Sequence, residues 1–160
     1  MNESLGPSVL FLGLCFGVAM LLTLGGVGWT QERHIRRQLT KVFLLAVAVQ
    51  CVHFAEELFT GFHQELPELF GFAPMSIDFF VGFNLAWIAI WLVAALAYER
   101  GKRAALCPIW FLALAAVGNG IVHPLLALRA GSYFPGLVTS PIIGISGAMV
   151  WAQLMKITKR

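Results

Sequence analysis

Five apolar runs, each about as long as a membrane-spanning helix, take up most of this 160-residue chain. The first run contains no charged residue and the others contain few; the runs cover residues 5–29, 42–59, 77–98, 104–128 and 137–155. A helix that crosses the hydrocarbon core of a bilayer needs about 20 mostly apolar residues, so five of them need about 100. Only short connections remain. The sequence therefore predicts one all-α domain, residues 1–160, a polytopic membrane helical bundle with five transmembrane helices.

The composition supports a membrane protein and excludes several other classes. Hydrophobic residues make up 59% of the chain and charged residues only 12%, unlike an ordinary soluble domain. Such a chain is too apolar for a disordered tail or for a nucleic-acid-binding module, whose basic residues would cover a water-facing surface. We therefore expect membrane lipids as partners and no nucleic acid. The three cysteines lie inside apolar runs and are interpreted as buried small hydrophobic residues.

The basic residues predict the orientation of the helices. In the five-helix topology Arg129 lies alone on one side, and all other basic residues lie on the opposite side: Arg33, Arg36, Arg37, Lys41, Arg100, Lys102, Arg103, Lys156, Lys159 and Arg160. Loops rich in Lys and Arg stay cytoplasmic, so the N-terminus is predicted outside and the C-terminus inside. No basic segment precedes the first run, and we expect it to remain in the mature protein. The expected location is a cell membrane, the inner membrane of a bacterium.

Small residues at helical spacing predict where helices pack closely. Gly13 and Gly17 have the GxxxG spacing, and Gly144 with Ala148 repeats a pattern of small residues four apart. The spacing does not distinguish contacts within one chain from contacts between copies. A homo-oligomer therefore stays among the alternatives.

A polar cluster interrupts the second apolar run, at residues 50–57 with the sequence QCVHFAEE. Residues three and four apart share one face of a helix, so His53 can meet both Glu56 and Glu57. An ionisable side chain in hydrocarbon costs at least about 2.5 kcal/mol. Three such groups within five residues must therefore face a cavity that is lined by protein or filled with water.

Counting along the runs places a second polar group at a similar depth. At 1.5 Å per residue from the basic end, His53 lies about 18 Å and Glu57 about 24 Å into the membrane. Asn119 and His123 of the fourth run lie at about 22 and 28 Å by the same count. Pro124 removes a backbone hydrogen bond, so a kink is expected beside them. We therefore expect the two histidines to converge in the outer half of the bundle.

Three motifs, in this order along the chain, resemble those of a known family. They are HFAEE at 53–57, the further histidine at 123, and Tyr-Phe-Pro-Gly at 133–136. The chain resembles the HXXEE-motif family of small integral membrane proteins, and the resemblance covers most of its length in order and topology. It implies an uncharacterised function and provides no reaction. It also implies that the following residues act as a set: His53, Glu56, Glu57, His123, Tyr133, Pro135 and Gly136.

Two imidazoles and two carboxylates at one depth suit a transition metal, zinc or iron. The predicted ligands are His53, His123 and one glutamate, taken as Glu57. The second glutamate would accept a proton from a metal-bound water or orient a ligand. The residues predicted to be catalytic are Glu56, Glu57, Asn119 and Tyr133. The predicted function is a membrane-embedded metal-dependent enzyme, a hydrolase or an oxygenase, that acts on a lipid-like small molecule.

Three alternatives use the same cluster differently. Adjacent Glu56 and Glu57 repel each other in apolar surroundings, so one could stay protonated and move a proton on a double bond, as in a metal-free isomerase or cyclase. The polar layer could instead bind or transport a small molecule or ion, or it could only tie helices together by hydrogen bonds. His63, Glu65 and Glu68 are interpreted as a solvated outer turn, with a lid or an extra ligand as the alternative.

Overall fold

The computed structural model describes residues 6–159, and within them it contains α-helices and no strand. The helices follow in the order α1 (Gly6–Leu24), α2 (Arg33–Phe59), α3 (Phe62–Leu69), α4 (Ile77–Glu99), α5 (Leu106–Ala130) and α6 (Ser140–Thr158), with a short 3-10 turn η1 (Arg103–Ala105) before α5. The predicted all-helical class is confirmed.

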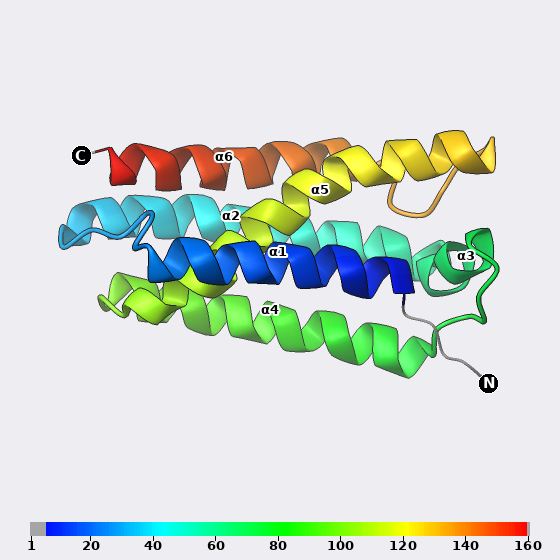
Figure 1. Ribbon diagram of the computed structural model, residues 1–160, viewed down its shortest axis with the longest axis horizontal. Helices are drawn as coiled ribbons and strands as arrows, with labels where there is room; N and C mark the ends of the chain where they lie inside the picture. The colour runs from blue at the N-terminus through cyan, green and yellow to red at the C-terminus, as the bar shows by residue number, and fades with distance from the viewer. Residues whose placement is uncertain (1–5, 160) are drawn as a thin grey trace.

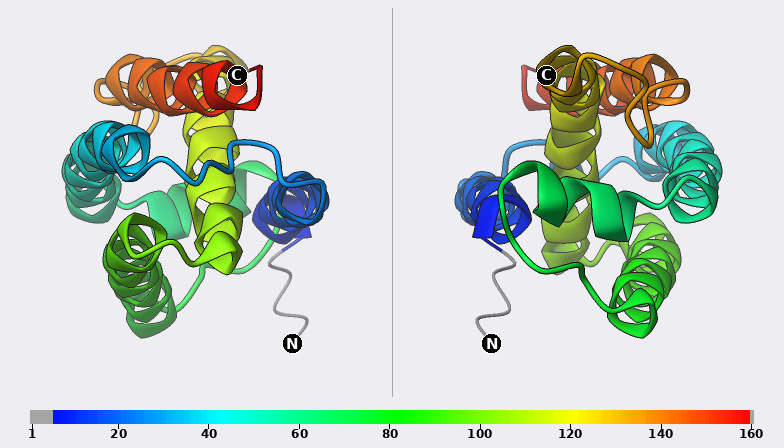
Figure 2. Two further views of the ribbon diagram at one scale, coloured as in Figure 1. Left: turned by 90° about the vertical axis from the view of Figure 1, so that its left-hand side faces the viewer. Right: turned by 90° about the vertical axis from the view of Figure 1, so that its right-hand side faces the viewer.

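The five long helices form a bundle in which α5 is central and α3 lies across one end (Figures 1 and 2). Half of the apolar part of η1 and α5 is buried inside the bundle, compared with 22% for α4. The outward face of α4 must therefore contact the surroundings of the protein. At the end opposite α3, which we call the basic end, α1, α4 and α6 finish and α2 begins (Figure 1). The basic residues predicted to be cytoplasmic lie in these helices, directly after them or in the connection between α4 and α5, except Arg160, which lies outside the described residues.

Three segments are long and apolar enough to cross a membrane: α2, α4 and Arg103–Ala130. This property indicates a membrane protein. Helices α1 and α6 have 19 residues each and are shorter than these three segments. The five-helix topology and its orientation therefore stay predictions.

Two helices differ in length from the predicted runs. Helix α2 begins at Arg33, nine residues before the apolar run, because the polar segment before that run is also helical. Its Arg36 is buried and donates to carbonyls of the preceding turn. Helix α1 ends at Leu24, five residues before its run ends, because Gly26 and Gly28 adopt φ values of 72° and 87°. Glycine adopts this left-handed backbone at little cost, and it ends the helix although the chain stays apolar.

The connection between α2 and α4, predicted as a loop, contains the short helix α3. Phe62, Leu66 and Leu69 are spaced four and three residues apart, which gives α3 one apolar face. Leu66 is buried together with Leu126 of α5 and with Phe134. Helix α3 forms because this face covers the end of the bundle, and the same spacing is the sequence signal that the loop interpretation overlooked.

Helices α5 and α6 approach closely through glycines. A Cβ added to Gly120 would lie 2.8 Å from Cα of Gly144, and one added to Gly147 would lie 2.6 Å from Cβ of Ala116. The close contact predicted at Gly144 is therefore confirmed. Ala148 is exposed, so the second small residue of this contact is Gly147 and not Ala148.

The GxxxG pair of α1 makes no such contact. A Cβ added to Gly13 or Gly17 would have no neighbour within 4 Å in the described part of the chain. Both glycines are exposed on the outside of the bundle. Packing at this pair within one chain is therefore excluded for the described residues, and contact between copies stays a prediction.

Helix α5 changes direction along its length, and its second part runs beside α6 (Figure 1). Pro124 lies inside this helix and cannot donate a backbone hydrogen bond. The bend agrees with the predicted kink.

Candidate metal centre

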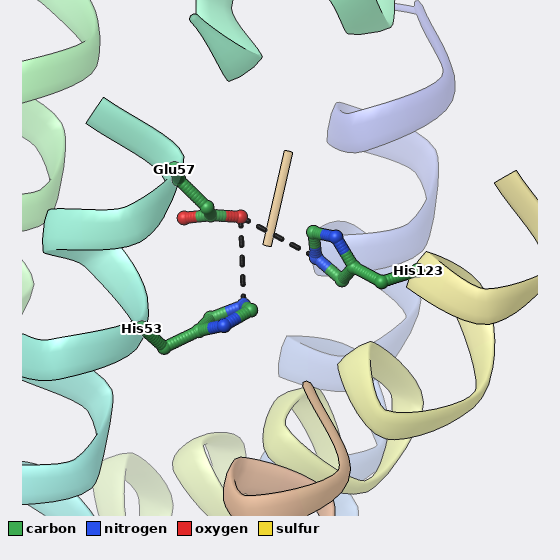
Figure 3. A group of neighbouring side chains, drawn as sticks. All are labelled: His53, Glu57 and His123. Atoms are coloured by element: carbon green, nitrogen blue, oxygen red, sulfur yellow. Dashed lines mark ion pairs between the residues drawn. The ribbon is translucent and has the colours of Figure 1, made fainter. Parts of the chain in front are cut away.

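Three buried side chains meet near the α3 end of the bundle, and we call them the triad: His53 and Glu57 from α2, and His123 from α5 (Figure 3). Oε1 of Glu57 lies 3.5 Å from Nε2 of His53 and 3.4 Å from Nε2 of His123. The centroids of the two imidazole rings are 4.8 Å apart. The exposed fraction is 0% for His53, 6% for Glu57 and 2% for His123. The triad could hold a metal ion.

The tautomer of His123 follows from its second ring nitrogen. Nδ1 lies 2.7 Å from the carbonyl oxygen of Pro135. A carbonyl oxygen only accepts hydrogen bonds, so Nδ1 carries the proton. In the neutral ring Nε2 therefore has a free lone pair, and Nε2 is the atom that faces Glu57.

The tautomer of His53 follows from a chain of two hydrogen bonds. The Thr139 hydroxyl donates its one proton to the carboxylate of Glu56, so it must accept from Nδ1 of His53, 2.7 Å away. Nδ1 therefore carries the proton in His53 too. The Nε2 lone pairs of both imidazoles point toward Glu57.

Glu56 fastens the connection between α5 and α6, residues 131–139, to α2. Its carboxylate accepts from the Tyr133 hydroxyl at 2.7 Å, from the Val138 backbone N–H at 2.9 Å, and from the backbone N–H and the hydroxyl of Thr139. Burial and the hydrogen bond to Glu56 raise the pKa of Tyr133, which keeps its hydroxyl a donor. Adjacent residues of a helix point about 100° apart, so Glu56 and Glu57 cannot both face the triad.

Gly136 lets the same connection approach both imidazoles. A Cβ added there would lie 2.6 Å from Nδ1 of His123 and 3.0 Å from Cε1 of His53. The residue also has a φ of 86°, in the left-handed region. Gly136 is therefore required both by its backbone conformation and by the space that the rings occupy.

Replacement of Gly136 by alanine is expected to lower stability more than replacement of Gly131. Both glycines have positive φ, so each alanine carries a backbone cost of about 1–2 kcal/mol. A Cβ at Gly131 meets nothing within 4 Å, whereas one at Gly136 pushes against the imidazoles. Thermal unfolding in detergent measures the difference. Equal unfolding midpoints for the two alanine variants would show that the imidazoles do not restrict the side chain at position 136.

The other residues predicted as catalytic lie around the triad. Nδ2 of Asn119 is 3.5 Å from Nε2 of His53, so this amide lies beside the triad. The structure does not bring Glu56 and Tyr133 into the triad, because they bond to each other. Tyr133 is 48% exposed, and its hydroxyl donates to Glu56.

The residues of the predicted outer turn also stay outside the triad. His63 is buried and stacks on the ring of Phe80, with centroids 6.0 Å apart. Glu65 and Glu68 are exposed on α3. The interpretation as a solvated turn is therefore wrong for His63 and agrees with the exposure of Glu65 and Glu68, and none of the three belongs to the triad.

Two groups that hold the triad were not predicted as such: the Thr139 hydroxyl and the Pro135 carbonyl. Thr139 precedes α6 at the position where a threonine usually caps a helix. In the structure it makes no side-chain cap and bonds to Glu56 instead. The sequence therefore contained a signal for a helix start and none for a role beside His53.

A cavity of about 260 Å³ adjoins the triad and is lined by residues of α1 to α5. Glu57 and His123 form part of its wall, whereas His53 lies behind them and is fully buried. Its other polar lining residues are Gln50, Asn84 and Asn119. Aromatic residues form a large part of the wall: Phe11, Phe62, Phe70, Phe79, Phe80, Phe83, Trp87, Trp91 and Phe111. The cavity could hold an apolar molecule against the triad.

Comparison with known proteins identifies a family and no characterised relative. No curated protein and no solved structure matches this chain. The family described as "Protein of unknown function with HXXEE motif" matches residues 43–151. This range contains the triad, Glu56 and the connection that Glu56 holds. The chain therefore belongs to the HXXEE-motif family of proteins of unknown function.

Proposed function

We propose that the protein is a membrane-embedded enzyme that uses zinc or iron, bound by His53, Glu57 and His123, to hydrolyse or oxidise a lipid-like small molecule. The spacing of the triad carries the proposal. Ligand atoms about 2.1 Å from a tetrahedral metal ion lie about 3.4 Å from each other. The carboxylate oxygen is 3.5 and 3.4 Å from the two Nε2 atoms, and the ligand atoms of the three residues all lie within 4.8 Å of one another, so two of the three spacings already fit an ion.

The hydrogen bonds of the imidazoles support the same proposal. Histidine ligands of metals usually donate their second N–H to a carbonyl or carboxylate, which fixes the tautomer and the ring orientation. His123 donates to a backbone carbonyl, and His53 donates to a hydroxyl that itself donates to Glu56. In these tautomers the Nε2 lone pairs of both imidazoles face the same carboxylate oxygen.

The cavity favours a catalytic metal site over a structural one. Structural zinc sites are closed by four protein ligands, whereas catalytic sites keep a position for water or substrate. The triad supplies three ligands, and Glu57 and His123 face the cavity. Two histidines with one carboxylate occur in zinc hydrolases and in non-haem iron oxygenases, so this ligand set fits both reaction classes.

We also propose that all five long helices cross the membrane, with the basic end in the cytoplasm. At 1.5 Å per residue, the 19 residues of α1 or α6 extend about 28 Å, close to the thickness of a hydrocarbon core of about 30 Å. Basic residues at one end favour the cytoplasm for that end. His123 then lies about 26 Å along α5 from Leu106, in the outer half of the membrane.

Loss of metal from variants of the histidines tests the proposed site. The protein is purified in detergent after growth with zinc or iron, and bound metal is measured by mass spectrometry. We expect bound metal in the wild type and a nearly complete loss in His53→Ala and His123→Ala. His34→Ala is the matched control, because His34 is exposed and far along α2 from the triad. A wild type without metal, or unchanged metal in both variants, would reject the site.

A further inference from the structure

We infer that the substrate is a neutral lipid with a single chain, which enters from the bilayer between α1 and α4 and points its chain toward the basic end. The polar group of this lipid would lie at the triad, so the inference rests on the proposed function. Four features of the cavity support it: its charge, its size, its direction and its mouth.

The charge of the wall favours a neutral molecule. The cavity is lined by one carboxylate, Glu57, and by no lysine or arginine. A phosphate headgroup would therefore find no basic side chain there, and its one positive partner would be the proposed metal ion, whose charge Glu57 already balances in part. On the side of α3 the wall is formed by apolar side chains, including Phe62, Leu66 and Phe70. This part of the cavity offers no polar space for a large headgroup.

The size and the direction of the cavity favour one chain that extends inward. Its volume of about 260 Å³ is at the lower end of ligand pockets, too small for a lipid with two chains. On α5 the lining runs from Phe111 to Leu126. His123 is about 18 Å from Phe111 along the helix but only about 5 Å from Leu126. On α5 the lining therefore extends farther from the triad toward the basic end than toward α3.

Aromatic rings form the inner part of this cavity. The rings of Trp87 and Phe111 have centroids 4.3 Å apart, and those of Trp91 and Phe111 are 6.3 Å apart. All three residues line the cavity and are apolar on the faces of their rings. This wall suits the chain of a lipid and excludes its polar group, which must then remain near the triad.

The mouth of the cavity faces the bilayer. Residues that line the cavity and are also exposed mark its opening; they are Phe79 and Phe83 on α4, 48% and 37% exposed, and Phe70 after α3, 37% exposed. Phe11 of α1 lines the cavity as well. Helices α1 and α4 both pack on α5 and lie on different sides of it (Figure 2). A lipid could therefore enter between them without crossing the layer of headgroups.

Photochemical labelling of the whole protein in detergent tests the inference. The probe is a long-chain primary alcohol with a diazirine at the end of its chain. We expect labelling of peptides that contain Trp91 or Phe111, and we expect excess unlabelled alcohol to compete with it. A phosphatidylcholine with a diazirine in one chain is the comparison, and its labelling should not be reduced by competition with the alcohol.

A variant that fills the inner part of the cavity tests whether the alcohol binds there. Ala115→Phe fills this part without touching the triad, and we expect the affinity for the alcohol to fall about tenfold with metal content unchanged. Ala115→Leu should give a smaller loss. Ala148→Phe, the same substitution at an exposed position of α6, should bind like the wild type.

Two results would overturn the inference: competed labelling of the cavity by the phospholipid, or labelling by the alcohol at Leu66 and Phe70 instead of the inner wall. Metal content measured in the same samples separates the two proposals. Bound metal without competed labelling means that the inference is wrong and the proposed function stands. Competed labelling in a protein that binds no metal means that the proposed function is wrong, while the cavity still binds the lipid.

Discussion

Replacement of Glu57 by glutamine is expected to remove the metal from the protein, whereas the same replacement of Glu56 should leave it bound. Glu57 is the one carboxylate of the triad, and its charge would balance a divalent ion in buried surroundings. A neutral amide is a weaker ligand and leaves two imidazoles alone with the ion. Measurement of bound metal in the two purified variants checks the prediction.

The neighbouring variant, Glu56→Gln, is the matched control because it changes the same chemical group one residue away. The Glu56 carboxylate accepts hydrogen bonds from four donors, and the amide group of glutamine can accept from only some of them. We expect a stability loss of about 1–3 kcal/mol from the donors left without partners, with metal retained. If Glu56→Gln loses its metal while Glu57→Gln keeps it, the assignment of the two glutamates is wrong.

Replacement of Thr139 by valine is expected to weaken metal binding about 10-fold to 100-fold, the usual effect of removing a group that holds a metal ligand. Valine has nearly the shape of threonine but no hydroxyl. Nδ1 of His53 would lose its acceptor, and Glu56 would lose one of its donors. The ring could then turn, and its proton could move to Nε2, the atom that must bind the ion.

The dissociation constant for zinc, measured by competition with a chelator, tests this prediction. Thr139→Ser keeps the hydroxyl and should restore most of the affinity, which a purely structural role of the methyl group would not explain. Circular dichroism should show the same helix content in both variants. Equal zinc affinity in Thr139→Val and the wild type would contradict the role of this hydrogen-bond chain.

The long helices could be predicted from the sequence, and their ends only partly. Apolar runs predict that helices exist because burial of such runs leaves few alternatives. The end of α1 depends on Gly26 and Gly28, whose backbone conformation overrides the apolar pattern. The start of α2 depends on a polar segment that hydropathy ignores. Helix α3 is short, and its apolar spacing is weak evidence without the surface that it covers.

The triad could be proposed from spacing and depth, but the choice between the two glutamates could not. Both lie within one turn of His53, and periodicity alone permits either to join it. The choice depends on the position of the connection between α5 and α6, which binds Glu56. The Pro135 carbonyl could not be predicted for the same reason, because a backbone acceptor leaves no mark in the sequence.

The connection held by Glu56 links the triad to the surface of the protein. The Pro135 carbonyl and the Thr139 hydroxyl of this segment accept hydrogen bonds from the imidazoles of His123 and His53. Tyr133 of the same segment is 48% exposed. An ion that fixed both rings would also restrain this segment. The metal-loaded and metal-free forms would then differ in the mobility of an exposed segment and not only at the buried triad.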